Sequence, residues 1–151
     1  MIPQPLFAYG TLQDADILGA VLGKIVVEAE LVPAHLAGHA IVYHPGRVYP
    51  ALLPRPGADA PGCLIPGLDA ADLAALDAFE GGEYRRDSRL VATADGLREA
   101  FLYWPLGPIP EHAPAWSLSV WRARHKPEIL DAETALARAA RATEGAISGC
   151  G

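Results

Sequence analysis

Proline and glycine recur along the whole chain and limit how far any helix or strand can run. The sequence holds 14 prolines and 15 glycines, spread through it rather than gathered in one linker. Proline lacks a backbone N–H, and glycine readily adopts left-handed backbone conformations, so both are typical of turns and element ends. We therefore expect a loop-rich fold of many short elements joined by tight turns.

Composition and length indicate one folded domain. With 51% apolar and 20% charged residues, the chain can bury a core and lacks the bias of a disordered segment. Its length is about that of one ordinary domain, so we expect a single domain over residues 1–151. Gly19, Gly23 and Lys24 interrupt the best candidate for a membrane-spanning run, and residues 1–4 lack the layout of a signal peptide. The expectation is a cytoplasmic protein with no membrane partner.

The charge balance argues against a nucleic acid partner. The net charge is −6 at neutral pH and the isoelectric point is near 5.2, whereas nucleic acids and anionic membranes attract basic surfaces. One basic cluster is Arg85, Arg86 and Arg89. On a strand its members would divide between the two faces, because successive side chains point to opposite sides.

The order of apolar runs and turn residues predicts a mixed fold. The expected strands cover residues 6–9, 25–32, 35–43, 48–53, 62–68, 84–94 and 99–104. The expected helices cover residues 14–22, 69–80, 116–125 and 127–143. Asp95 and Gly96 predict a hairpin turn between the last two strands.

Mostly antiparallel strands interrupted by a central helix indicate the α+β class. We expect a small, mostly antiparallel β-barrel or strongly curved sheet with flanking helices. Its core is expected within residues 5–104, and a C-terminal helical segment at 115–143 is expected to pack across the barrel mouth or an open sheet face.

The helix expected at residues 69–80 carries an acid where an aliphatic residue is normal. At about 100° per residue, Leu73, Leu76, Asp77 and Glu80 share one stripe, which normally faces a core. Burial disfavours an ionised carboxylate, raises its pKa and costs stability. Glu80 is therefore a candidate functional residue.

A plainer explanation of Glu80 is also available. The last helical turn can lie in water, with Glu80 exposed or paired with Arg85 or Arg86. The helix position does not decide between the two explanations, so a second candidate site has to.

That second site is the turn formed by Tyr9, Gly10, Thr11 and Leu12, which lies between an expected strand and an expected helix. A glycine there lets backbone N–H groups approach a ligand closely, and successive N–H groups can form a concavity for a carboxylate or an oxyanion. The tetrapeptide alone is more often an ordinary turn. Its combination with Glu80 is what indicates a site.

The histidines and cysteines do not predict a metal site. On a strand His35 and His39 share a face while His44 points the other way, and neither Cys nor acid stands at a matching spacing. Cys63 and Cys150 lie far apart and form neither a disulfide framework nor a metal motif. We expect Cys63 to be a small buried strand residue rather than a nucleophile.

Three motifs occur in order and resemble one known family. They are FAYGTL at residues 7–12, YPAL at 49–52 and LDAFEG at 76–81, the last followed by Tyr84 and Arg86. Together they resemble the gamma-glutamylcyclotransferase-like superfamily, and its AIG2-like branch in particular. The similarity runs from residue 6 to about residue 104.

The resemblance implies roles for particular residues. It implies that Glu80 is the catalytic carboxylate. It implies that the substrate is bound by Tyr9, Gly10, Thr11, Leu12, Tyr49 and Tyr84. The family usually has serine where this chain has Thr11, and the added methyl group would narrow the pocket and affect specificity.

The resemblance also implies a reaction. In a gamma-glutamyl amide the α-amine attacks its own γ-carbonyl, closes the five-membered ring of 5-oxoproline and expels the other amine. The α-amine is mostly protonated at neutral pH, so a general base is needed, and one carboxylate can also return the proton to the leaving amine. Neither metal nor organic cofactor is needed.

Two alternatives to this reaction are open at the level of sequence. The fold can serve as a non-catalytic small-molecule binding or interaction module, although such a module has no need for a buried acid. It can also be an enzyme that cuts a different acyl amide. The leaving amine, the oligomeric state and the role of the C-terminal helices are not predicted.

Overall fold

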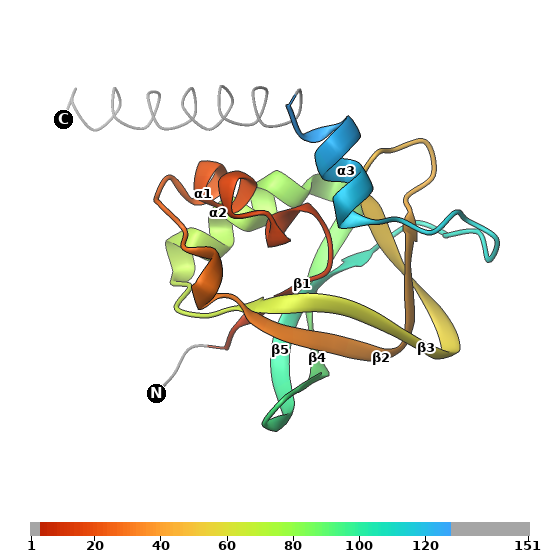
Figure 1. Ribbon diagram of the computed structural model, residues 1–151, viewed down its shortest axis with the longest axis horizontal. Coiled ribbons are helices and arrows are strands. Elements are labelled where there is room, and N and C mark those ends of the chain that lie inside the picture. The colour runs from red at the N-terminus through yellow and green to blue at the C-terminus, as the bar shows by residue number, and fades with distance from the viewer. Residues whose placement is uncertain (1–3, 128–151) are drawn as a thin grey trace.

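The computed structural model describes residues 4–127 and has a closed five-strand barrel at its centre (Figure 1). The strands are β1 (Leu6–Ala8), β2 (Val32–Tyr43), β3 (Pro50–Ile65), β4 (Tyr84–Thr93) and β5 (Gly96–Pro105). The helices are α1 (Ala15–Leu22), α2 (Ala70–Glu80) and α3 (Leu118–Arg124), with short 3-10 helices η1 (Thr11–Gln13), η2 (Glu28–Glu30) and η3 (Gly81–Glu83).

The barrel closes in the order β1-β3-β2-β4-β5. Among the described strands β1 and β5 run parallel, while the other neighbours run antiparallel. The predicted α+β class, with a small and mostly antiparallel barrel and flanking helices, is therefore confirmed.

One strand replaces two that the sequence predicted. Residues 48–53 and 62–68 were expected to be separate strands, but β3 runs without a break from Pro50 to Ile65. The register with β2 shifts between Ala37 and His39, opposite the proline-rich middle of β3. Proline and glycine are tolerated at such irregularities because the ladder is already interrupted there. The separate-strand prediction was wrong because it treated a bend as an end.

The strand predicted at residues 25–32 was also wrong. Ile25 is 94% exposed, residues 28–30 form η2, and β2 begins only at Val32. A run of apolar residues forms a strand only when a neighbouring strand pairs with it, and the barrel offers none to this segment.

The helix ends follow the expected capping chemistry. Asp14 caps α1 by accepting from two backbone N–H groups, and Gly23 ends that helix in a left-handed conformation. Asp69 and Asp72 form a reciprocal capping box at the start of α2. These local signals explain why both helices were predicted close to their observed bounds.

The remaining predictions hold with adjusted bounds. The hairpin between β4 and β5 is present, but its two-residue loop is Ala94 and Asp95, with Gly96 already in β5. The helix expected at residues 116–125 is the shorter α3. The helix expected at 127–143 lies, apart from its first residue, outside the described residues.

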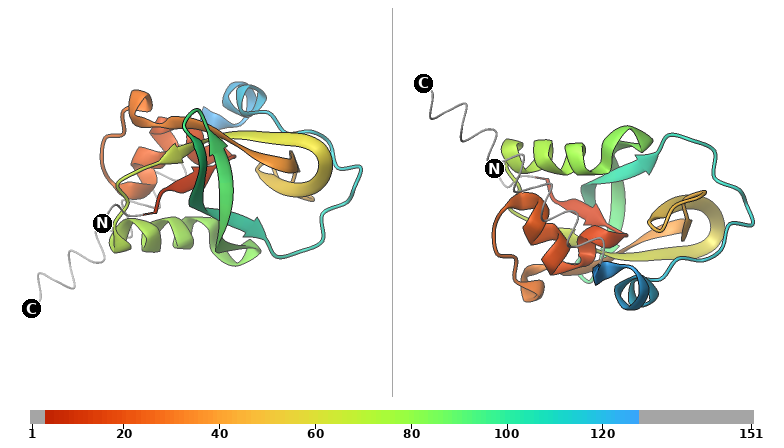
Figure 2. Two further views of the ribbon diagram at one scale, coloured as in Figure 1. Left: turned by 90° about the horizontal axis from the view of Figure 1, so that it is seen from below. Right: turned by 90° about the horizontal axis from the view of Figure 1, so that it is seen from above.

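The three helices gather at one end of the barrel (Figure 1), and α1 lies between α2 and α3 (Figure 2). One apolar cluster fills the barrel and includes Phe7, Leu52 and Leu102. A second cluster, which includes Ile17 and Leu76, joins the barrel to the helices. None of the helices in residues 4–127 is both long and apolar enough to cross a membrane.

Candidate functional site

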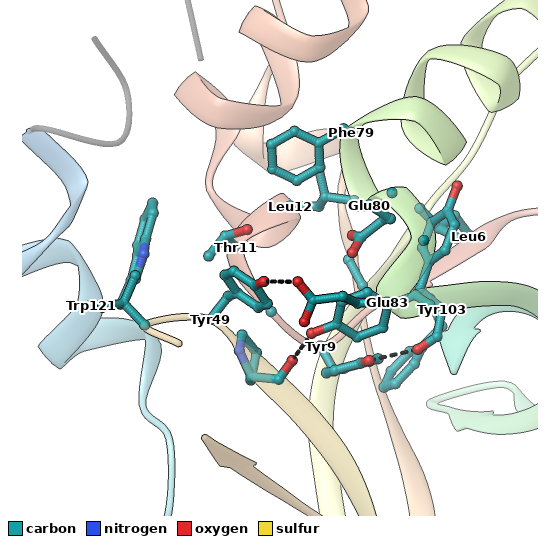
Figure 3. A pocket seen from close by; sticks show the side chains of 18 residues that line it. Leu6, Tyr9, Thr11, Leu12, Tyr49, Phe79, Glu80, Glu83, Tyr103 and Trp121 are labelled. Atoms are coloured by element: carbon teal, nitrogen blue, oxygen red, sulfur yellow. Dashed lines mark hydrogen bonds between the residues drawn. The ribbon is translucent and has the colours of Figure 1, made fainter. Parts of the chain in front are cut away.

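A cavity of about 300 Å³ opens at the helical end of the barrel. The sequence-predicted residues that line it are Tyr9, Gly10, Thr11, Leu12, Tyr49, Glu80 and Tyr84. Segments far apart in the chain thus meet at one place, because β1, the start of β3, the end of α2 and β4 all converge on this end of the barrel. Figure 3 shows the side chains around this space.

Glu80 is the last residue of α2, and its carboxyl group faces the cavity (Figure 3). Leu76, one turn earlier, is fully buried, so the apolar stripe of α2 holds the acid against the barrel. Burial raises the pKa of Glu80 to about 8. Among residues 4–127 no side chain or backbone group forms a hydrogen bond or ion pair with the Glu80 carboxyl.

The arginine pairing that the plainer explanation of Glu80 offered does not occur. Arg86 pairs with Asp77 at 3.0 Å, between Nε and Oδ1, and Arg85 pairs with Asp87 at 3.6 Å. Both arginines that were candidate partners of Glu80 are therefore engaged elsewhere.

Tyrosine hydroxyls around Glu80 are already committed as hydrogen-bond donors. The Tyr9 hydroxyl donates to the backbone oxygen of Tyr103 at 2.6 Å, and the Tyr84 hydroxyl donates to the backbone oxygen of Pro50. Burial, and then the nearby Glu80 carboxyl, raise the pKa of both Tyr9 and Tyr84 above the ordinary range. Both hydroxyls therefore stay neutral, and their hydrogen bonds to backbone oxygens hold the two rings in place in the cavity wall.

The turn at residues 10–12 is built differently from the left-handed turn that a glycine often marks. Gly10 has a φ of −120°, so its backbone does not require glycine. The requirement is space, because an added Cβ would lie 2.8 Å from Cγ of Pro50. Thr11 starts η1, and the first N–H bonded within it is that of Gln13, which donates to the Gly10 oxygen at 3.2 Å. The N–H groups of residues 10–12 precede that bond and so have no partner inside η1.

Glu83 also lines the cavity, and sequence reasoning missed it. It accepts a hydrogen bond from the Tyr49 hydroxyl at 2.6 Å and forms an ion pair with Arg47 at 3.2 Å. Nε2 of His44 lies 3.3 Å from the second carboxylate oxygen of Glu83. The Tyr49 bond, and then the Arg47 contact, lower the pKa of Glu83 below its ordinary value. Its spacing of three residues from Glu80 was the one available signal.

The cavity has further walls that the sequence did not indicate. They are Leu6, Phe7, Ala8, Val48, Pro50, Phe79, Gly81, Gly82, Tyr103 and Trp121. Trp121 comes from α3, well beyond the last motif of the sequence. Nothing in its local sequence distinguishes it from a core tryptophan.

The histidines and Cys63 lie outside the cavity lining. Within the described part of the chain, no group of three His, Cys, Asp or Glu side chains is arranged to hold a metal ion. The ring of His44 packs beside those of Tyr49 and Tyr84, each with centroids 5.7 Å apart. Burial raises the pKa of Cys63 to about 11, so its thiol stays protonated at neutral pH.

The chain matches a known protein family over most of its length. The sequence model of the family described as gamma-glutamyl cyclotransferase, AIG2-like, matches residues 6–123. This chain belongs to that family. The family resemblance drawn from the three motifs is thereby confirmed, and the match extends past them into α3.

Individual relatives agree with the family assignment. The chain is 27% identical to AIG2-like protein A of Arabidopsis thaliana over 129 residues, which are 83% of this chain and 76% of that protein. It is similar to the solution structure of another Arabidopsis thaliana protein, with a TM-score of 0.64, 26% identity, and 85% and 87% of the two chains covered.

A third similarity concerns the fold alone. A solved structure named gamma-glutamyl cyclotransferase has a TM-score of 0.57 and 17% identity to this AIG2-like chain, with 69% of this chain and 67% of that chain covered. At this identity the two share an architecture, and the residues of the site have to be argued from their own geometry.

Proposed function

We propose that this chain is a cyclotransferase that acts on gamma-glutamyl amides and releases 5-oxoproline and an amine, with Glu80 as general acid and base. The observation that carries the proposal is the Glu80 carboxyl, which faces a small cavity and whose pKa burial raises to about 8. A group with a pKa near the working pH can both accept a proton and return it. Family membership supports the class of reaction.

The proton balance of the reaction requires such a group. The α-ammonium loses a proton before its nitrogen can attack the γ-carbonyl carbon. A new C–N bond then closes the ring, and the C–N bond to the amine breaks. Of the three ammonium protons, one stays on the lactam nitrogen, one goes to the leaving nitrogen and one goes to solvent. Glu80 accepts a proton from the attacking nitrogen and returns it to the leaving nitrogen.

The walls of the cavity favour ring closure by holding the substrate folded. The hydroxyls of Tyr9 and Tyr84 are bound to backbone oxygens, so these side chains need not rearrange. The N–H groups of residues 10–12, which have no partner inside η1, suit the substrate carboxylate or the developing oxyanion. Correct positioning in an intramolecular reaction is worth up to about 7–11 kcal/mol of the barrier.

The proposal involves a small-molecule partner and neither a nucleic acid nor a cofactor. Every step uses only the side chains and backbone N–H groups of the cavity together with the substrate's own nitrogen. The cytoplasmic location that we predicted from the sequence stays a prediction.

The decisive experiment measures 5-oxoproline release from a panel of gamma-glutamyl dipeptides and gamma-glutamyl amines. We expect turnover by the wild-type protein and a loss of about 10²–10⁴-fold in Glu80→Gln, because glutamine keeps the shape of the side chain but cannot take a proton. Glu83→Gln is the matched control: it removes the other carboxylate of the cavity and should lose far less activity.

Two outcomes would count against the proposal. Wild-type activity in Glu80→Gln would remove Glu80 from the chemistry. Silence of the folded wild-type protein across the panel would instead favour a non-catalytic binding module, or an enzyme for an acyl amide outside the panel.

A further inference from the structure

Trp121 joins the cavity from a part of the chain that follows the barrel. It belongs to α3, its side chain is fully buried, and its indole lines the cavity. Every other residue of the lining lies in or between the elements from β1 to β5. The wall contributed by Trp121 is therefore the only one in the described structure that depends on how α3 is placed.

The position of α3 is held on both sides of Trp121. On one side the Arg122 guanidinium binds the buried Asp14 carboxylate, with Nε and Oδ2 2.8 Å apart. On the other side the Trp116 indole donates to the Val48 oxygen at 3.0 Å. These two contacts fasten α3 on either side of the fully buried indole of Trp121 and so position that wall of the cavity.

Glu80 and Trp121 lie at opposite sides of the cavity, with Thr11 and Tyr49 between them (Figure 3). For attack, the glutamyl half of the substrate must fold back so that its α-nitrogen reaches the γ-carbon, which keeps that half compact beside Glu80. The amine half is the part of the substrate whose length can vary and that extends away from Glu80. It is thus the part that meets Trp121.

We propose that Trp121 is a specificity-determining residue that sets the longest amine the cavity accepts. This inference rests on the proposed function for the identity of the substrate. A cavity of about 300 Å³ is at the small end of ligand pockets, so the glutamyl half leaves little room beyond it. An indole buries about 150–250 Å², and its removal would lengthen the space by a large part of a side chain.

The test compares gamma-glutamyl n-alkylamides from methyl to hexyl as substrates. Trp121→Ala should raise kcat/KM for the hexylamide relative to the methylamide by about tenfold or more over the wild-type ratio, since each methylene accepted or refused is worth about tenfold or more. Trp121→Phe should give a smaller rise. Trp104→Ala is the matched control, because Trp104 packs against His39 and Arg89 and not against the cavity.

The result that overturns the inference is an equal change for every chain length. That pattern would mean that Trp121 supports the fold of the site without selecting the substrate. If Trp121→Ala does not fold, Trp121→Phe and Trp121→Leu carry the same comparison, and a ratio unchanged from wild type in both overturns it.

A binding experiment separates this inference from the proposed function. Simple n-alkyl carboxamides, from propanamide to octanamide, are titrated while the backbone amide shifts of residues 10–12 are followed by NMR. The longest carboxamide that binds should be longer for Trp121→Ala than for the wild-type protein. If neither protein turns over substrate but the longest bound carboxamide differs between them, the proposed reaction is refuted and the role of Trp121 is retained. If the longest bound carboxamide is the same in both proteins, or neither protein binds any, the role of Trp121 is refuted.

Discussion

Asp14 is a buried carboxylate and Glu80 a partly buried one, and the two regions that hold them treat the charge in opposite ways. At the junction of α1 and α3, Asp14 accepts from the Ile17 N–H, from Arg122 at 2.8 Å and from Lys126 at 3.0 Å. Burial alone would raise its pKa, but these partners outweigh burial and lower it. Within residues 4–127 the Glu80 carboxyl has no such partner, and burial raises its pKa to about 8.

The difference distinguishes an acid that stabilises the fold from an acid that can exchange protons. A buried acid with cationic and N–H partners is stable as an anion and holds elements together. A buried acid without them costs folding energy and exchanges protons near neutral pH. The cavity itself repeats the contrast, because Glu83 has the partners that Glu80 lacks and its pKa is lowered.

The largest change in stability is expected at Asp14, the carboxylate that has cationic partners. Asp14→Ala removes the N-cap of α1 and leaves the Arg122 and Lys126 charges without their shared partner, so the free energy of unfolding should fall by about 3–5 kcal/mol. Urea unfolding measures it. Asp16→Ala is the control: this exposed partner of Lys126 should cost at most about 1 kcal/mol. A loss for Asp14→Ala no larger than the control would remove the contrast.

A smaller effect is expected at the turn that faces Glu80. Gly10→Ala places a Cβ 2.8 Å from Cγ of Pro50, and relieving this overlap should cost about 1–3 kcal/mol and shift the turn. Unfolding in urea and the affinity for substrate measure the two consequences. Gly82→Ala adds a Cβ with nothing within 4 Å and serves as the control for space. Normal stability and binding in Gly10→Ala would refute the close packing of the turn.

Glu80→Gln should raise the stability of the protein at high pH, whereas most substitutions lower stability. The folded pKa of Glu80, about 8, lies above its ordinary value of 4.5, so the folded state binds more protons between these pH values and stability falls as pH rises through them. Glu80→Gln removes this loss and should be about 1–2 kcal/mol more stable than wild type at pH 9, with little difference at pH 4. Equal stability at both pH values would show that Glu80 is not desolvated.

Asp14 should show the opposite pH dependence in the same experiment. Its folded pKa is lowered, so its contribution is present above the unfolded pKa and is lost as pH falls through the folded value. Asp14→Asn should therefore lose part of the acid sensitivity of wild type, and Glu80→Gln should not.

The smallest effect concerns the pH profile of turnover. The acid limb of kcat/KM reports the free enzyme and should lie near pH 8, where Glu80 becomes ionised. In the complex the substrate ammonium favours the ionised carboxylate, so the acid limb of kcat should lie at lower pH. Steady-state kinetics between pH 5 and 9, with a substrate titrated separately for its own amine, measures both. Coincident limbs would contradict a direct contact between Glu80 and the ammonium.

Local chemistry in the sequence predicted several elements closely. The expected helix at residues 69–80 is α2, Ala70–Glu80, because Asp69 and Asp72 cap it and Gly81 ends it. The expected helix at residues 14–22 is α1 for similar reasons. Caps and breakers act on their own neighbours in the chain, so they can be recognised without knowing what packs on the helix.

Contacts between distant residues could not be predicted in the same way. The run at residues 25–32 is as apolar as a strand but has no strand to pair with, while the prolines of β3 lie at a bend that the rest of the barrel stabilises. Whether an apolar or proline-rich segment joins a sheet depends on its neighbours in space.

The sequence by itself determined the capped helices, the family motifs and the presence of an acid on the apolar stripe of α2. Only the tertiary structure decided that Glu80 lacks a partner among the described residues while Glu83 has several, and that Trp121 of α3 lines the cavity. The physical reason is that a cap or a stripe is set by residues a few positions apart. The pKa of a carboxyl and the size of a cavity are set instead by every group that the fold brings within a few ångströms.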